Sequence, residues 1–498
     1  MPEIHDLSLI IDSQIPLIVI ETHEERRALD MITRLALKKS LPLFNWTVTA
    51  GIQRLGFGFE LERQDKKQEP EAVLEYIKQQ SSSAIYVLCD FHPYLDDSPK
   101  VIRHIKDIAL DYSRLGHTLI FVSYAFEIPR EIKPFSAKFN LRLPQADQIL
   151  SIVREEATLW SRHHNQKVKT DQLTLQRLVK NLQGLTIAEV RRLARGAIVD
   201  DGAITESDLP EVNKAKFELM DMGGVLSFEY DTARFQDVAG LPNLKDWLTK
   251  RTKAFLHSTQ EKSDQNASLS PPKGILLLGI QGSGKSLAAK AVAGLWQLPL
   301  LRLDFGSLYN KFFGETEKNL RQALQLAELM SPCVLWLDEV EKGLGQDSQD
   351  QGVSKRLLGT LLTWMSEKSH PVFIVATANK VHTLPPELIR KGRLDEIFFV
   401  DLPDLEARAA IFRIHLQKRN QSPEHFQVSE LAMLSEGFSG AEIEQAVVSS
   451  LYTAEALSEK LSQAHLVEEL SSTQPLSIVM AEEVAALRLW AESRTVKA

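Results

Sequence analysis

Short, continuous runs of apolar residues recur along the chain, separated by stretches with helical spacing. The first runs lie at 16–20 (PLIVI), 84–89 (AIYVLC) and 118–123 (TLIFVS), and each is typical of a strand buried on both faces. Residues 24–39 and 100–115 have the spacing of helices that bury one side. In the first of these helices, the predicted buried face carries Leu29, Ile32, Leu35 and Ala36. Strands that alternate with helices predict a parallel α/β sheet.

The second half of the chain repeats this order. Apolar runs at 275–278, 334–337 and 372–375 follow one another as the first three do, and Asp338 ends its run as Asp90 does. Leu402-Pro403 before a predicted helix parallels Leu143-Pro144, and GFSGAEI at 437–443 parallels GLTIAEV at 184–190. One such match could arise by chance, but the shared order favours a duplicated domain. An unrelated α/β domain at the N-terminus is the alternative.

A glycine-rich loop sits between a predicted strand and a predicted helix in the second half. Residues 279–286 (GIQGSGKS) fit G-x-x-x-x-G-K-[ST], with the strand at 274–278 before them and the helix at 287–295 after them. Such a loop turns backbone N–H groups toward phosphate oxygens, and the helix N-terminus adds a positive dipole end. The predicted nucleotide ligands are Gly279, Gln281, Gly282, Ser283, Gly284, Lys285, Ser286 and Leu287, with the Ser286 hydroxyl also a ligand for Mg²⁺. A chance match is the alternative, and the strand–loop–helix context disfavours it.

The N-terminal copy lacks this loop. At the equivalent place, residues 21–25 (ETHEE) offer neither glycine nor lysine, and their carboxylates would repel phosphate. Phe91, not an acid, follows Asp90. The sequence therefore predicts a degenerate domain without nucleotide that serves for contacts.

Further candidate chemistry lies downstream of the loop. Asp338 ends a predicted strand and is predicted to hold Mg²⁺, and Glu339 is predicted to orient the attacking water. Asn379 ends the next strand and could bond the γ-phosphate or this water, although Asn is also a common turn residue. Arg390 and Arg393 could neutralise transition-state charge on the nucleotide of their own or of a neighbouring subunit, and a surface basic cluster is the alternative.

Length and composition limit the remaining possibilities. A chain of 498 residues suggests two to four domains, and a net charge of -8 disfavours a general nucleic-acid binder. The sequence has no run of 18 or more apolar residues, so we expect no transmembrane helix, and the N-terminus lacks the pattern of a signal peptide. Cys89 and Cys333 are predicted to be buried free thiols. The predicted divisions are a degenerate domain at 1–205, a linker at 206–233, an ATPase domain at 234–402, and a helical lid with a C-terminal helix at 403–498.

Residues 237–440 resemble the catalytic module of the ring-forming AAA+ ATPases, because the loop, Asp338-Glu339, Asn379 and the two arginines follow that family's order. The resemblance implies a parallel α/β domain with a small helical lid, ATP and Mg²⁺ as cofactors, a homo-oligomer that is a hexameric ring, and a protein partner. It also implies further site residues. They are Asp237, Val238 and Ala239 at the adenine, His415 in the lid, Gly440 and Ala441 at the second sensor position, and the pore loop Lys311, Phe312, Phe313 and Gly314.

The whole chain is similar to AAA proteins of cyanobacteria and algal plastids known as hypothetical chloroplast open reading frame forty-six. This resemblance rests on a degenerate α/β half, one AAA+ module and a C-terminal helix at 480–493, whose predicted buried face carries Met480, Val484, Leu487 and Trp490. It implies a cyanobacterial cytoplasm or plastid stroma, and a regulatory role in photosynthetic metabolism. Remodelling of a protein partner is the leading hypothesis, and an ATP-state-dependent switch or scaffold without threading is the rival. A nucleic-acid-associated ATPase is a third reading, which the acidic balance disfavours.

Overall fold

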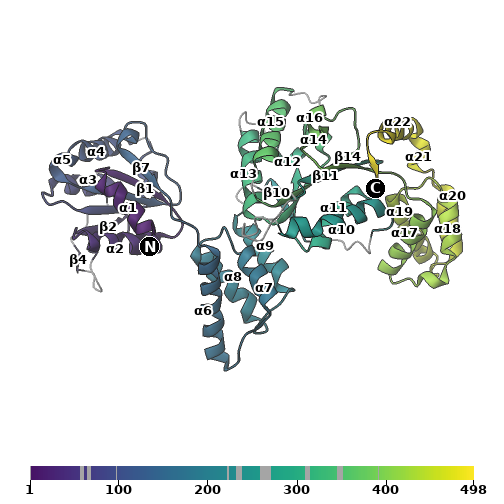
Figure 1. Cartoon of the computed structure of the whole chain (residues 1–498), viewed down its shortest axis with the longest axis horizontal. Helices are drawn as coiled ribbons and strands as arrows, with labels where there is room; N and C mark the ends of the chain where they lie inside the picture. Colours follow the sequence, from purple (N-terminus) through teal and green to yellow (C-terminus); the bar gives the residue numbers. More distant parts are fainter. Residues whose placement is uncertain are drawn as a thin grey trace. The chain divides into compact units, whose positions relative to one another are not determined.

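The chain forms two compact units in a computed structural model (Figure 1). One unit comprises residues 1–148 with 185–191, and the other comprises 149–184 with 192–498. Each unit contains its own seven-stranded sheet. The structure describes residues 2–55, 61–63, 69–96, 98–220, 224–230, 238–257, 271–308, 315–344, 351–368, 370–390 and 392–498.

The sheet of the N-terminal unit has the strand order β4-β3-β2-β5-β6-β1-β7. Its strands are β1 Leu17–Glu21, β2 Leu43–Thr47, β3 Gly51–Leu55, β4 Leu61–Arg63, β5 Ile85–Cys89, β6 Thr118–Ser123 and β7 Ser136–Phe139. Helices α1 Pro2–Asp12 and α2 Glu25–Lys38 pack on one face, and α3 Pro70–Gln79 and α4 Pro99–Leu110 pack on the other. A short helix α5, Tyr112–Leu115, follows α4. The predicted strands at 16–20, 84–89 and 118–123 are thus confirmed as β1, β5 and β6.

A group of helices follows this sheet in the chain. It contains α6 Ala146–His164, α7 Gln172–Asn181, α8 Ile187–Val199 and α9 Asp208–Met220, with short strands β8 Lys169–Thr170 and β9 Ala203–Ile204. Helix α9 falls within the segment predicted to be a linker. One face of this helix is buried: Lys216 is 1% exposed and Phe217 is 6% exposed. The Lys216 ammonium donates hydrogen bonds to the carbonyl oxygens of Gln183 and Leu329, and the latter ends a helix of the ATPase domain.

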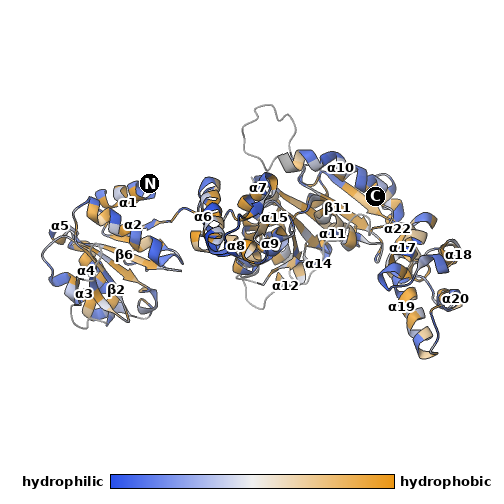
Figure 2. Cartoon of the chain, turned by 90° about the horizontal axis from the view of Figure 1, so that it is seen from below, coloured by the Kyte–Doolittle hydropathy of each residue, from blue (hydrophilic) through white to orange (hydrophobic). Residues whose placement is uncertain are grey.

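The C-terminal sheet has the order β10-β12-β13-β14-β11-β15-β16. Its strands are β10 Leu226–Glu229, β11 Gly274–Gly279, β12 Leu300–Asp304, β13 Cys333–Asp338, β14 Val372–Ala378, β15 Glu396–Val400 and β16 Val496–Lys497. Helices α10 Pro242–His257 and α11 Lys285–Trp296 cover one face, and α13 Glu315–Leu329 and α15 Gln351–Glu367 cover the other. Short helices α12 Phe305–Leu308, α14 Val340–Leu344 and α16 Pro386–Ile389 lie in the connections. Strands β6 and β11 are coloured as mainly hydrophobic in Figure 2, in keeping with strands buried on both faces.

The two sheets share a five-strand core. The parallel order β2-β5-β6-β1-β7 in the first matches β12-β13-β14-β11-β15 in the second. The residue after the second strand of this core, β5 or β13, has a positive φ in both, +49° at Asp90 and +45° at Glu339. By backbone conformation, Asp90 therefore corresponds to Glu339 and not to Asp338. The repeated order confirms the predicted pair of related α/β domains.

Helices complete the C-terminal unit. They are α17 Leu405–Lys418, α18 Val428–Leu434, α19 Gly440–Ala456, α20 Gln463–Ser472, α21 Leu476–Val479 and α22 Ala481–Glu492. Helix α22 buries Val484, Leu487 and Ala491 against the core of the large sheet, and β16 pairs with β15. Both cysteines are buried free thiols, as predicted. In the described part of the chain, no helix is long and apolar enough to cross a membrane.

Candidate nucleotide site

The glycine-rich loop joins β11 to α11 at the carboxyl edge of the C-terminal sheet. Gly282 and Gly284 have φ values of +76° and +97°, a region that side chains with a Cβ rarely adopt. A Cβ on Gly282 would also lie 2.9 Å from the hydroxyl oxygen of Ser439 in the lid. Both the loop conformation and the close approach of the lid thus require glycine at this position.

Lys285 begins α11 with its side chain turned back into the loop. It is 7% exposed, and its ammonium donates hydrogen bonds to the carbonyl oxygens of Gly279 (3.0 Å) and Ile280 (2.7 Å). The hydroxyl oxygen of Ser283 is buried without a hydrogen-bond partner among the described residues. A buried polar atom of this kind costs stability unless a ligand supplies the partner. Phosphate oxygens would satisfy it, so the loop fits a bound phosphate.

Two ionisable groups at this edge have shifted pKa values. Burial lowers the pKa of Lys285 to about 8, although Glu341, Glu339 and Asp338 oppose the shift. Burial also raises the pKa of Glu341. The free site therefore loses the positive charge of Lys285 at a much lower pH than an exposed lysine would.

This shift predicts that ATP affinity falls as the pH rises above about 8. Above that pH, Lys285 is neutral in the free protein, and ATP binding must take up a proton to restore the ammonium. Each pH unit should then cost up to about tenfold in affinity. Calorimetry at pH 9 in two buffers of different protonation enthalpy would detect the proton. Equal binding heats in both buffers would contradict the prediction.

The predicted catalytic residues Asp338, Glu339 and Asn379 come together at the ends of β13 and β14. The Asn379 side-chain amide donates to Glu339 Oε1 at 3.1 Å, and Glu339 also pairs with Lys342. The Thr377 hydroxyl donates to Asp338 Oδ1 at 2.8 Å and accepts from the Glu339 backbone N–H at 3.1 Å. This arrangement orients both carboxylates next to the glycine loop.

Glu341 and Thr377 are site residues that the sequence interpretation missed. Glu341 Oε1 accepts the backbone N–H of Asn379 at 2.8 Å, while its Oε2 is buried without a partner among the described residues. The available signal was the position of Glu341 on the first turn of α14, two residues after Glu339. Thr377 carried only the signal of a polar side chain inside an apolar strand.

The lid contacts the loop through the start of α19. The Ala441 backbone N–H donates to the Gly282 carbonyl oxygen at 3.2 Å, and Gly440 lies next to the same carbonyl. His415 lies in α17 with its Nδ1 3.4 Å from a carboxylate oxygen of Glu444. Burial lowers the pKa of His415, although Glu444 opposes the shift. The structure thus brings Gly440 and Ala441 to the loop and places His415 beside Glu444 within the lid.

The predicted adenine segment is described in part. Val238 is 4% exposed, and its carbonyl oxygen accepts from the Lys245 ammonium at 2.7 Å. Ala239 is half-buried, and a Cβ on Gly240 would contact Ala407 of α17 at 3.5 Å, so this segment lies against the lid. Asp237 and the predicted pore loop of Lys311, Phe312, Phe313 and Gly314 lie outside the described residues.

Three family profiles match the chain. The profile of the ATPase family associated with various cellular activities (AAA) matches residues 275–402. Profiles for the N-terminal domain and the second domain of SpoVK-like AAA ATPases match residues 3–139 and 147–223. The profile of the second domain, at 147–223, covers most of the segment 206–233 that was predicted to be a linker. The predicted domain limits stay predictions.

The AAA domain-containing protein ycf46 of Pyropia yezoensis is 36% identical over 493 residues, which cover 98% of this chain and 97% of the relative. The ycf46 protein of Trieres chinensis is 35% identical over 503 residues, with 99% and 97% covered. The chain belongs to the ycf46 group of AAA ATPases. The Cell division cycle protein 48 homolog of Archaeoglobus fulgidus is 32% identical over 262 residues, which cover 50% of this chain and 34% of that protein.

The two candidate arginine fingers of this AAA ATPase have different surroundings. Arg390 is exposed at the end of α16, whereas Arg393 is half-buried and donates to the Leu362 carbonyl oxygen of α15 at 2.8 Å. No hydrogen bond or ion pair joins either arginine to the glycine loop in the described part of the chain. Arg390 is therefore the more accessible of the two arginines.

The N-terminal AAA-like domain has a carboxylate where the C-terminal one has its glycine loop. Glu24 precedes α2, its side chain is 8% exposed, and it pairs with Arg27 at 2.8 Å. It also accepts the backbone N–H of Ala188 at 3.4 Å. Ala188 is the sequence equivalent of Ala441, which bonds Gly282 in the catalytic copy. A fixed negative charge at the helix start opposes phosphate binding there.

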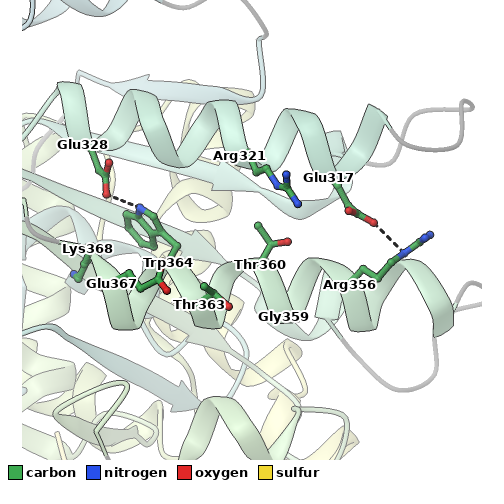
Figure 3. Close-up of a pocket in the computed structure, with 10 residues that line it drawn as sticks. All are labelled: Glu317, Arg321, Glu328, Arg356, Gly359, Thr360, Thr363, Trp364, Glu367 and Lys368. Carbon is green, nitrogen blue, oxygen red and sulfur yellow. Dashed lines mark hydrogen bonds and ion pairs between the residues drawn. The ribbon is translucent and has the colours of Figure 1, made fainter.

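A groove of about 700 Å³ lies between α13 and α15 of the AAA module, on the sheet face opposite α11 (Figure 3). Glu317 pairs with Arg356 at 2.9 Å at one end, and Trp364 donates to Glu328 at 2.9 Å at the other. None of its described lining residues belongs to the glycine loop. These contacts tie the two helices together and are separate from the nucleotide site.

Proposed function

We propose that the C-terminal module hydrolyses ATP with Mg²⁺, in a ring of identical subunits that acts on a protein partner. The observation that carries the hydrolytic part is the 3.1 Å hydrogen bond between Asn379 and Glu339 at the sheet edge that holds Lys285. Membership of the AAA ATPases supports the class of reaction. A hexameric ring is the proposed assembly.

The chain's own residues divide the work of hydrolysis. The loop N–H groups, the Ser283 hydroxyl and Lys285 would bind the phosphates, as the unpaired buried Ser283 oxygen suggests. Ser286 and Asp338 would hold Mg²⁺, which would neutralise charge on the phosphate oxygens. Glu339 would orient a water and accept its proton.

Assembly would complete the catalytic site. Asn379 orients Glu339 within one subunit, but transition-state charge on the γ-phosphate also needs a cation close by. The exposed Arg390 would supply it to the nucleotide of a neighbouring subunit. Hydrolysis would then depend on the neighbouring subunit.

Remodelling of a protein partner through the pore loop of Lys311, Phe312, Phe313 and Gly314 is the proposed outcome. The N-terminal domain favours the rival, an ATP-state-dependent switch or scaffold without threading. It keeps the AAA-like strand order but has Glu24 at the phosphate position, so it is suited to binding a partner instead of nucleotide. The proposed location is a cyanobacterial cytoplasm or a plastid stroma, in line with the ycf46 relatives. A regulatory role in photosynthetic metabolism is a further part of the proposal.

A two-step experiment separates these outcomes. A Glu339→Gln variant held with ATP would first be used to measure the mass of the assembly and to capture the partner. If the pore loop threads the partner, Phe312→Ala should abolish work on that partner while most of the ATPase rate remains. A Tyr452→Ala variant, which removes a ring that is 68% exposed on α19, would be the control for loss of an aromatic ring. Unchanged partner activity in Phe312→Ala would favour the switch.

A further inference from the structure

Both carboxylate oxygens of Asp338 are held by other side chains. Oδ1 accepts from the Thr377 hydroxyl at 2.8 Å, and Oδ2 accepts from the Arg302 guanidinium at 2.7 Å. The Asp338 side chain is 13% exposed. The carboxylate is therefore anchored at two points, and each oxygen keeps a lone pair for another partner.

Besides Asp338, two groups contact Arg302. Its guanidinium carbon lies 4.9 Å from the centre of the Trp336 ring, the cross-strand neighbour of Arg302 on β13. Its Nη1 lies 3.8 Å from Glu229 Oε1. Glu229 Oε2 in turn lies 3.1 Å from the ammonium of Lys290. Lys290 belongs to α11, the helix that begins at the phosphate-binding lysine.

We propose that Arg302 is a positioning residue for the metal ligand Asp338, and that Glu229 holds Arg302 in that position. The inference rests on the proposed ATPase function of the module. Arg302 touches neither nucleotide nor metal in this account. It acts by fixing the torsion angle of the Asp338 carboxylate, so that the free lone pairs of its oxygens keep one direction.

The orienting contact of Arg302 and its positive charge predict opposite changes in metal affinity when the side chain is removed. Groups that orient a metal ligand from outside typically contribute about 10–100-fold to metal affinity. A guanidinium next to a metal ligand also repels a cation, and the removal of that charge would strengthen metal binding. The side-chain contacts favour orientation. One contact from Arg302 would be enough to neutralise the Asp338 carboxylate, whereas two contacts, from Thr377 and Arg302, also restrict its rotation.

Glu229 gives this arrangement a link to another part of the chain. It ends β10, the edge strand that follows α9 and pairs antiparallel with β12. Helix α9 carries the buried Lys216, which bonds the carbonyl of Leu329 at the end of α13. A shift of β10 along β12 would move Glu229 relative to Arg302.

Equilibrium binding of ATP by the full-length chain, measured in EDTA and across a Mg²⁺ titration, tests the proposal without hydrolysis. In Arg302→Met, the Mg²⁺ concentration that gives half of the metal-dependent gain in ATP affinity should rise about 10–100-fold. The affinity in EDTA should not change. Arg302→Lys should behave like Arg302→Met, because an ammonium cannot span Asp338 and Glu229 as a planar fork does.

Glu229→Gln should give a smaller rise, and the double variant should match Arg302→Met. Arg488→Met is the matched control, because Arg488 of α22 is bound to the carboxylate of Asp401. It should leave the Mg²⁺ titration unchanged. An unchanged or lower Mg²⁺ requirement in Arg302→Met would overturn the proposal, as would wild-type behaviour of Arg302→Lys. If the wild-type chain failed to bind ATP in EDTA and in Mg²⁺, the proposed function would fail instead.

Discussion

Replacement of Glu339 by Gln is expected to slow ATP hydrolysis by about 10²–10⁴-fold while ATP binding is retained. The Glu339 carboxylate accepts from the Asn379 side-chain amide, whereas Glu341 accepts from the Asn379 backbone N–H. Glu339 is the proposed acceptor of a proton from a water beside the γ-phosphate. Glutamine keeps an oxygen for the Asn379 amide, so the local geometry should survive. The basicity of the group is lost.

Phosphate release per chain and equilibrium ATP affinity measure the two effects separately. Glu367→Gln is the matched control, because Glu367 is an exposed carboxylate at the end of α15, in the groove opposite the site. It should leave both quantities unchanged. A Glu339→Gln variant that hydrolyses ATP within threefold, or roughly 0.7 kcal/mol, of wild type would remove Glu339 from the catalytic role.

Replacement of Arg390 by Ala is expected to lower the hydrolysis rate by about 10³–10⁵-fold, the usual contribution of an arginine finger. The expectation follows from exposure, because Arg390 is free of the contact to Leu362 that holds Arg393 within its own subunit. Arg393→Ala should instead cost stability, about 1 kcal/mol for the lost hydrogen bond.

Mixing of two inactive variants tests whether Arg390 acts on a neighbour. Arg390→Ala keeps an intact glycine loop, and Lys285→Ala keeps an intact arginine. When the two proteins are mixed and assembled, some sites combine a working loop with a working arginine, and activity should return. No recovery, with mixed assembly shown by mass, would mean that Arg390 acts in its own subunit or has no catalytic role.

The buried core of both sheets could be predicted from sequence because parallel strands covered on both faces read as continuous apolar runs. Strands such as β6 (TLIFVS) and β14 (VFIVATA) show this pattern over their whole length. The edge strands do not, because β10 (LSFE) and β16 (VK) are short and bury one side at most. Helix α9 was not predicted because its buried face is not wholly apolar and includes the charged Lys216.

The residues of the candidate site could be predicted from the sequence where one local segment carries the reactive groups. The glycine loop and the pair Asp338-Glu339 are of this kind. The anchors of Asp338 are not, because Arg302 and Thr377 come from β12 and β14 and meet it only through the register of adjacent parallel strands. The hydrogen bond from Arg393 to Leu362 could not be predicted either, because it joins the segment before β15 to helix α15, 31 residues earlier in the chain. Sequence patterns identify reactive groups, whereas tertiary contacts decide what holds them.

The central claim is that the C-terminal module binds the only nucleotide in each chain, with Glu24 blocking the equivalent place in the N-terminal domain. The most direct test is the number of ATP molecules bound per chain at saturation, measured on Glu339→Gln with Mg²⁺. One ATP per chain, lost in Glu339→Gln combined with Lys285→Ala, is the predicted result. Two ATP molecules per chain, or one that survives Lys285→Ala, would contradict the account.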